Sequence, residues 1–240
     1  MKRRRLDDIL LEKGRVRDKN EAFILVTEGR VFVDGQRAIS PSQPIKEVAK
    51  IEIRGLPEYV GRGAYKLEAA LDKFGVDVTG RICADIGSAT GGFTEVLLNH
   101  GAKKVYSIDT AHGKLALKLR EDPRVVVMEE TDVRDTPHLP EVVDLVTIDV
   151  SLISLRDILS HVGRFLSKSG SVVALFKPQY ETRDQKILHH GVIEDKVARE
   201  KLLKDFITWA KDSGWRVIDW MESPIQGSEG NVEYLLYLRF

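Results

Sequence analysis

A carboxylate followed by a glycine-rich turn stands between an apolar strand-like segment and a helix-like segment. Residues 85–94 read Asp-Ile-Gly-Ser-Ala-Thr-Gly-Gly-Phe-Thr. Glycines let a backbone approach a ligand closely, and a helix that begins after such a turn offers free N–H groups. The spacing is neither the Gly-x-Gly-x-x-Gly of dinucleotide sites nor a Gly-Lys-Ser/Thr grip on a triphosphate. The turn therefore predicts a ligand site, but not a phosphate cradle.

Two further acids follow the next strand-like segments and narrow the choice of ligand. Asp109 stands where such folds place an acid that accepts hydrogen bonds from ribose hydroxyls, and Asp132 stands where an acid could contact an adenine amino group. An acid directly before the glycines suits an ammonium group. S-adenosylmethionine has an ammonium and a ribose but no phosphate, so we predict it as the cofactor. The predicted cofactor residues are Asp85, Gly87, Ser88, Gly91, Phe93, Asp109 and Asp132, of which Phe93 could equally be a core residue of the helix.

A second group of charged residues could carry acid–base chemistry. Asp149 and Lys177 each follow a continuous apolar segment, so a parallel sheet would bring both to the edge that carries the glycine turn. Lys66 precedes the sheet, and Glu233 begins the last strand. For these two, spacing alone does not decide between a functional site and an ordinary surface ion pair.

The elements that position these residues alternate between strand and helix from about residue 80. Strands are predicted at 81–85, 104–109, 125–128, 143–149 and 171–176, with helical segments between them, one of them at 92–100. This alternation is typical of an α/β fold with a parallel, doubly wound, Rossmann-like sheet. The last two strands, around 215–221 and 232–238, are joined by a turn with Pro and Gly, which predicts an antiparallel pair at the end of the sheet.

The chain before residue 57 has a different charge. It has 13 Lys or Arg against 9 Asp or Glu, whereas the whole chain is neutral with 37 of each. Two short helical segments are followed by small strands and an Asp-Gly turn at 34–35, which indicates a small α+β module. Such a basic density would meet a phosphate backbone favourably, although a solvated N-terminus is the alternative reading.

This first stretch resembles the alpha-L RNA-binding domain. The resemblance is carried by Arg5-Leu6-Asp7, by Ala22 and by residues 29–31 and 33–35. It implies that basic side chains of the helical pair contact folded RNA. The candidate RNA contacts are Arg3, Arg4, Arg15, Arg17 and Lys19. We expect an RNA-binding domain at 1–56, a linker at 57–64 and a methyltransferase domain at 65–240.

Over nearly its whole length the chain resembles the TlyA family, which joins an alpha-L domain to an FtsJ-like class I methyltransferase domain. The matching motifs are residues 62–67, 85–94, 149–155, 177–179 and 230–234. The resemblance implies S-adenosylmethionine-dependent 2'-O-methylation of ribosomal RNA by a tetrad of Lys66, Asp149, Lys177 and Glu233. Lys177 would contact the acceptor hydroxyl, the two acids would orient the lysines, and Lys66 would supply a second positive charge. Which lysine acts as base stays open.

Other features exclude several classes of protein. No apolar run exceeds five residues, whereas a transmembrane helix needs about 20, and no signal peptide is recognisable. We therefore expect a cytoplasmic protein that binds ribosomal RNA or ribosomal subunits and no membrane. The single cysteine, Cys83, excludes a disulfide scaffold, and methyl transfer from a sulfonium needs no metal. Two alternatives are a non-catalytic ribosome-assembly factor with a vestigial fold and a membrane-active hemolysin. The intact tetrad disfavours the first, and the lack of apolar spans disfavours the second.

Overall fold

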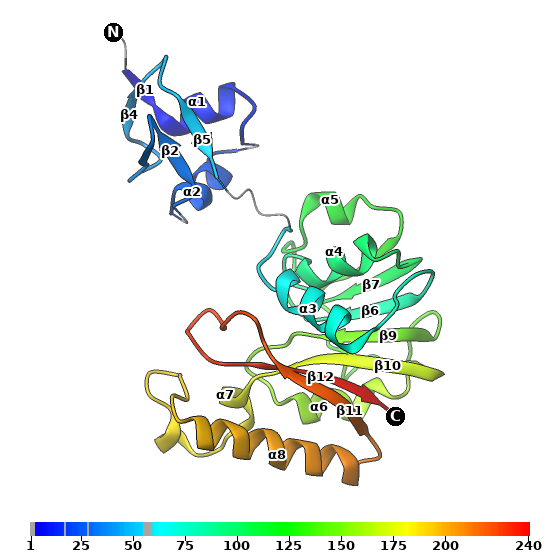
Figure 1. The fold of residues 1–240 in the computed structure, drawn as a ribbon. Coiled ribbons are helices and arrows are strands. Elements are labelled where there is room, and N and C mark those ends of the chain that lie inside the picture. The colour runs from blue at the N-terminus through cyan, green and yellow to red at the C-terminus, as the bar shows by residue number, and fades with distance from the viewer. Residues whose placement is uncertain (1–2, 17, 28, 55–58) are drawn as a thin grey trace. The chain divides into compact units, whose positions relative to one another are not determined.

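The computed structural model describes residues 3–16, 18–27, 29–54 and 59–240. The chain divides into two compact units, Met1–Glu58 and Tyr59–Phe240 (Figure 1). Each unit has its own apolar core. No helix among the described residues is long and apolar enough to cross a membrane.

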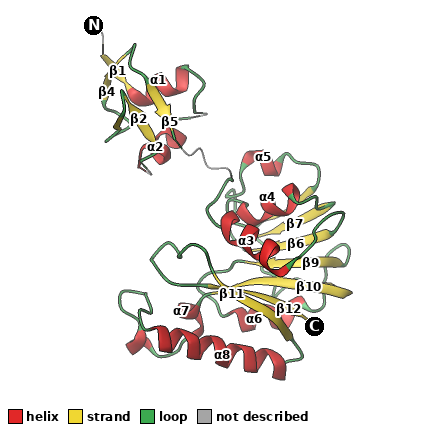
Figure 2. Cartoon of the chain, viewed as in Figure 1, coloured by secondary structure: helices red, strands yellow, loops and turns green. Residues whose placement is uncertain are grey.

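Over its described residues, the first unit contains two helices and two small sheets (Figure 2). Strand β1 (Arg3–Arg5) pairs antiparallel with β4 (Pro44–Lys46), and β2 (Val31–Val33) lies between β3 (Gln36–Arg37) and β5 (Ile51–Ile53). Helices α1 (Leu6–Glu12) and α2 (Lys19–Thr27) each pack one apolar face into the core, with Leu6, Ile9, Leu10, Ala22, Leu25 and Val26. Asp34 and Gly35 both have positive φ, 50° and 82°, as the tight turn between β2 and β3 requires.

The second unit is built around a seven-stranded sheet in the order β11-β12-β10-β9-β6-β7-β8. Its strands are β6 (Ile82–Ile86), β7 (Lys104–Ile108), β8 (Val125–Met128), β9 (Val143–Ile148), β10 (Leu166–Phe176), β11 (Arg216–Glu222) and β12 (Tyr234–Arg239). All neighbours pair parallel except β12, which lies antiparallel between β10 and β11. The expected Rossmann-like sheet with an antiparallel last strand is confirmed.

Helices cover both faces of this sheet (Figure 1). On one face lie α3 (Ala64–Phe74), α4 (Gly92–Asn99) and the short α5 (Leu117–Arg120), whose apolar side chains pack with Cys83, Leu145 and Val173. On the other face lie α6 (Leu155–Val162) and α8 (Lys196–Asp212), which pack with Val146 and Ala174. Two short elements, α7 (Pro178–Glu181) and a 3₁₀ turn at Gln185–Ile187, follow β10. Alternate residues of each central strand therefore enter different cores, as strand geometry requires.

The segment expected to be a linker, 57–64, is divided by the fold. Residues 57 and 58 lie outside the described residues, whereas the chain from Tyr59 packs in the second unit. Tyr59 is buried and meets Tyr65 edge-on, and the Val60 N–H donates to the Glu95 carboxylate at 2.6 Å. Helix α3 begins at Ala64, one residue before the expected domain start. A buried aromatic side chain and a partly buried hydrogen bond therefore fix the stretch from Tyr59 in the second unit.

Candidate active site

Two adjoining cavities open at the edge of the sheet where the parallel strands end. The lysine cavity, about 290 Å³, contains Lys66, Asp149, Lys177 and Glu233 in its lining. The acidic cavity, about 620 Å³, contains Asp109 and Asp132. Gly87, Ala89, Asp149 and Ser151 line both. Two sets of residues that were predicted separately thus share one wall.

Lys177 lies directly after β10 and reaches across to the residues that follow β9. Its Nζ lies 2.7 Å from Asp149 Oδ1 and donates to Ser151 Oγ at 2.9 Å. Because β9 and β10 are parallel neighbours, their carboxyl ends meet, and that topology produces the contact. The Lys177 side chain is 10% exposed and that of Asp149 is 24% exposed, so the lysine is largely buried while the carboxylate keeps access to water.

Lys66 and Glu233 form a second pair from opposite ends of the unit. Helix α3 places Lys66, and Glu233 lies one residue before β12. Lys66 Nζ donates to Glu233 Oε2 at 2.5 Å, and the two side chains are 9% and 3% exposed. Spacing in the sequence had left the place of these two residues open, and the fold brings both into the lysine cavity.

Glycines keep the backbone close to both acids. At Gly87, where φ is +81°, an added Cβ would lie 2.3 Å from the Asp149 carbonyl oxygen. At Gly227, an added Cβ would lie 2.5 Å from Glu233 Oε1. Both distances are far below a van der Waals contact, so a side chain at either position would displace one of the carboxylate residues.

The acidic cavity has a fixed carboxylate at one end and an ion pair at the other. Asp109 accepts hydrogen bonds from the N–H groups of Ala89 and Ala111, both at 2.7 Å. Asp132 pairs with Arg134 at 2.6 Å, and the hydrogen bond from this guanidinium lowers the pKa of the carboxyl. The lining also has an apolar part, made of Ile108, Val133, Val150, Ile153 and Ile158. A planar apolar ring with polar groups at its ends matches this arrangement.

Asp85 lies beneath the glycine turn rather than in the lining of either cavity. The residue is fully buried and lines neither cavity; it accepts hydrogen bonds from the hydroxyls of Thr94 at 2.6 Å and Thr147 at 3.0 Å. Burial raises the pKa of the carboxyl to about 7, against the effect of these hydrogen bonds. The reason is strand alternation, which turns Asp85 to the same face as Cys83, beneath α4. In this structure Asp85 anchors the glycine turn from below.

The other predicted cofactor residues differ in access. Gly87, Ser88 and Phe93 line a small cavity of about 150 Å³ beside the two larger ones. Gly91 lines none of these three cavities. It is the N-cap of α4 with a φ of +95°, and an added Cβ would lie 2.3 Å from the Leu119 side chain. Phe93 is also buried in the core below α3, so both readings of this residue have support.

Sequence reasoning missed two residues of the site. Ser151 lines both larger cavities and holds Lys177, although only its place in the segment after β9 could have indicated it. Leu152 is 87% exposed and has a φ of +66°, which is unusual for a residue other than glycine. No sequence pattern marks that backbone conformation.

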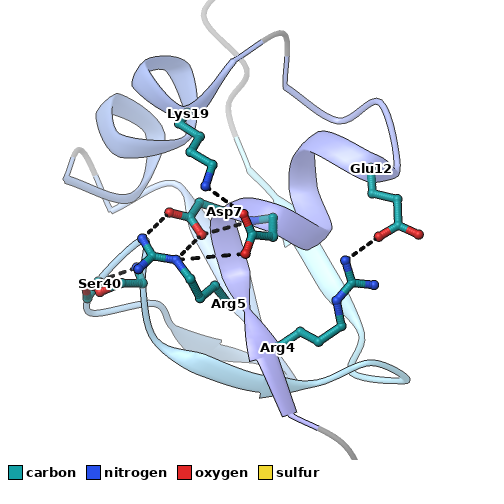
Figure 3. A network of polar contacts seen from close by, with 8 residues as sticks. Arg4, Arg5, Asp7, Glu12, Lys19 and Ser40 are labelled. Carbon is teal, nitrogen blue, oxygen red and sulfur yellow. Dashed lines mark hydrogen bonds and ion pairs between the residues drawn. The ribbon is translucent and has the colours of Figure 1, made fainter.

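The predicted RNA contacts of the first unit fall into two groups. Arg4 pairs with Glu12 at 2.6 Å, and Lys19 pairs with Asp8 at 2.8 Å; Figure 3 shows the network they join. Within the described part of the chain, neither Arg3 nor Arg15 has an acidic partner, and both are exposed. Arg15 lines a cavity with Lys13. Arg17 lies outside the described residues.

Family comparisons agree with this architecture. A family model of FtsJ-like methyltransferases matches residues 59–240, and an S4 domain model matches residues 4–49. The chain is 38% identical to Hemolysin A of Brachyspira hyodysenteriae over 97% of this chain and 98% of that protein. It is 39% identical to the 16S/23S rRNA (cytidine-2'-O)-methyltransferase TlyA of Mycobacterium tuberculosis, over 99% of this chain and 90% of the relative.

Solved structures show the same fold. A Streptococcus thermophilus protein described as a hemolysin superposes with a TM-score of 0.77 at 36% identity, covering 99% of this chain and 88% of its own. An S-adenosylmethionine-dependent methyltransferase from Listeria monocytogenes superposes with a TM-score of 0.55 at 18% identity, covering 74% of this chain and 98% of its own. The second likeness concerns the fold alone.

Proposed function

The chain belongs to the FtsJ-like methyltransferases of TlyA type, which also contain an S4 domain, and on that premise we propose that it methylates a ribose 2'-hydroxyl of ribosomal RNA with S-adenosylmethionine. The observation that carries this proposal is the convergence of two lysine–carboxylate pairs on one cavity. Lys177 with Asp149 and Lys66 with Glu233 line it together, and the acidic cavity adjoins it.

The acidic cavity suits the cofactor in shape and in chemistry. Gly87 and Asp149 both line the cavity, and at Gly87 the backbone lies so close to Asp149 that no side chain fits. Asp109 would hold the ribose hydroxyls, Asp132 would face the adenine, and the apolar residues between would enclose the ring. When bound, S-adenosylmethionine supplies an electrophilic methyl group.

The residues of the lysine cavity would hold the acceptor hydroxyl. An ammonium group has three N–H donors, and Lys177 uses two of them on Asp149 and Ser151, which leaves one for the acceptor oxygen. As the methyl group bonds to the acceptor oxygen, the hydroxyl proton passes to solvent water. Lys177, with Lys66 as a second cation, stabilises the negative charge that develops on that oxygen. Asp149 and Glu233 fix the positions of the two lysines.

Names and contacts together support ribosomal RNA as the substrate. The M. tuberculosis relative acts on 16S and 23S rRNA by its name, and a relative from Campylobacter jejuni is named for 23S rRNA alone. An S4 domain in which Arg3 and Arg15 are exposed and have no acidic partner among the described residues fits a phosphate backbone. We propose further that the protein acts in the cytoplasm, on ribosomal subunits.

The proposal is tested by methyl transfer to isolated subunits. Purified protein and tritiated S-adenosylmethionine are incubated with small and large ribosomal subunits from a strain that lacks the gene. We expect incorporation into RNA of at least one subunit, and none with Lys177→Ala, although this variant should bind the cofactor as the wild type does in calorimetry. Cofactor binding without transfer to either subunit would contradict ribosomal subunits as the substrate.

A further inference from the structure

A buried carboxylate below the lysine cavity connects the two segments that carry the Lys177–Asp149 pair. Glu181 is the last residue of α7, four residues after Lys177, and its side chain is 2% exposed. One oxygen accepts a hydrogen bond from Ser154 Oγ at 2.7 Å, and the other accepts from the Leu155 N–H at 2.6 Å. Both donors belong to the segment that begins with Asp149.

The segment between β9 and α6 contains a strained backbone conformation that contacts with its surroundings must stabilise. Leu152 has a φ of +66°, and a residue other than glycine holds that conformation only where its surroundings impose it. At the end of the segment, Ser154 is the N-cap of α6. Its hydroxyl accepts a hydrogen bond from the Arg156 N–H at 3.2 Å and donates one to the Glu181 carboxylate. Glu181 thus completes the helix start and fixes the end of the strained loop.

A cation lies beside Glu181, and two aromatic rings pack against that cation. Arg156 Nε lies 3.4 Å from Glu181 Oε2, and its guanidinium lies 5.8 Å and 5.5 Å from the ring centres of Phe206 and Trp209 on α8. Burial raises the pKa of Glu181, against the hydrogen bonds from Ser154 and Leu155. The Glu181 carboxylate therefore favours one relative position of the two segments. A small shift of either segment would break its hydrogen bonds to Ser154 and Leu155 while leaving it buried.

The two segments meet at two levels. At the cavity, Lys177 contacts Asp149 and Ser151; beneath it, Glu181 contacts Ser154 and Leu155. We propose that Glu181 is a positioning residue for the methyl transfer, which holds the 149–155 segment against the segment after β10 and thereby sets the Lys177–Asp149 contact. This inference rests on the proposed function for its effect on rate, but the effect on the loop is independent of it.

Four variants test the inference. Glu181→Gln keeps the size of the side chain but turns an NH₂ group toward one of the two donors. Ser154→Ala removes one donor, and the double variant joins both changes. Glu141→Gln is the control for the same chemical change away from the site: Glu141 is 36% exposed, accepts from Tyr106 Oη at 2.7 Å and pairs with Lys104 at the opposite edge of the sheet.

Displacing catalytic groups by about 1 Å can lower a rate about 100-fold. For Glu181→Gln we expect kcat to fall about 10- to 100-fold while the Kd for S-adenosylmethionine stays within about twofold. The double variant should lose little more than either single variant, because both changes break one contact. Glu141→Gln should keep kcat within about twofold of the wild type. Amide hydrogen exchange over residues 149–155 should be faster in Glu181→Gln and unchanged in the control.

Unaltered kcat, or unaltered exchange over residues 149–155, in a folded Glu181→Gln protein would overturn the inference. So would a parallel loss of cofactor binding, which indicates a general structural role. If Glu181→Gln does not fold, Ser154→Ala alone decides by the same measurements. If the wild type does not transfer methyl groups, the proposed function is refuted instead. The hydrogen-exchange data then test only whether Glu181 holds residues 149–155 in place.

Discussion

The buried Lys66–Glu233 pair allows a test that separates its effect on stability from its role in catalysis. Glu233 is 3% exposed, and its partner lies 2.5 Å away, so Lys66→Met would leave a carboxylate charge without water or counter-ion. Removal of one partner from a buried ion pair costs about 3–5 kcal/mol of unfolding free energy. For a chain of this size that corresponds to a fall in Tm of about 6–20 °C. Lys66→Met with Glu233→Gln removes both charges and should recover at least half of the loss.

Tryptophan fluorescence during urea unfolding measures this directly. All three tryptophans, Trp209, Trp215 and Trp220, lie in the second unit, so the signal reports on the unit that contains the pair. Lys177→Met is the control: it leaves Asp149, whose side chain is 24% exposed and keeps access to water, and should cost less. All three variants should be inactive in methyl transfer. The reasoning is refuted if Lys66→Met is as stable as the wild type, or if the double variant is no more stable than Lys66→Met.

Three further outcomes follow from the geometry. Gly87→Ala should lower kcat about 100-fold or more, because the alanine Cβ would lie 2.3 Å from the Asp149 carbonyl oxygen and would displace Asp149. A kcat within threefold of the wild type would contradict this close approach. Asp85 has a pKa raised by burial to about 7, so its contribution to stability falls as pH rises from about 4 to 7. Asp85→Asn should remove this slope, and the urea midpoint of the variant should rise relative to the wild type over that range; a constant difference would count against a buried carboxyl. Arg15→Ala should weaken RNA binding and reduce the slope of log K against log salt by about 0.7–0.9, the value of one phosphate contact. Arg4→Ala removes a cation already paired with Glu12 and should change this slope less. Equal slopes for the wild type and both variants in filter binding would argue against a phosphate contact at Arg15.

Most of the second unit could be predicted because parallel topology follows from local patterns. Apolar strands that alternate with helical segments place Asp109, Asp149 and Lys177 at one edge of the sheet, and the structure confirms the sheet that does so. The Lys66–Glu233 contact could not be derived, because it joins residues 167 positions apart from elements outside the parallel repeat. Only the family resemblance connected those two residues.

Asp85 shows how strand alternation bears on a prediction made from a local motif. The strand period of two gives Asp85 the same direction as Cys83, which belongs to an apolar strand face, so an inward carboxylate could have been predicted. The acid-before-glycine pattern suggested a ligand contact instead. Glu181 carried no signal in the sequence, since its partners Ser154 and Leu155 meet it only after β9 and β10 have paired.

The chemical position of the transferred methyl group tests the central claim most directly. Ribosomal RNA methylated by the purified protein is digested to nucleosides for mass spectrometry, and a second portion is hydrolysed in alkali, which cannot cleave beside a 2'-O-methyl ribose. We expect one 2'-O-methylated nucleoside and an alkali-resistant dinucleotide that carries the label, and neither with Lys177→Ala. A methyl group on a base, with complete alkaline cleavage at the labelled nucleotide, would contradict the roles assigned to the two lysine–carboxylate pairs.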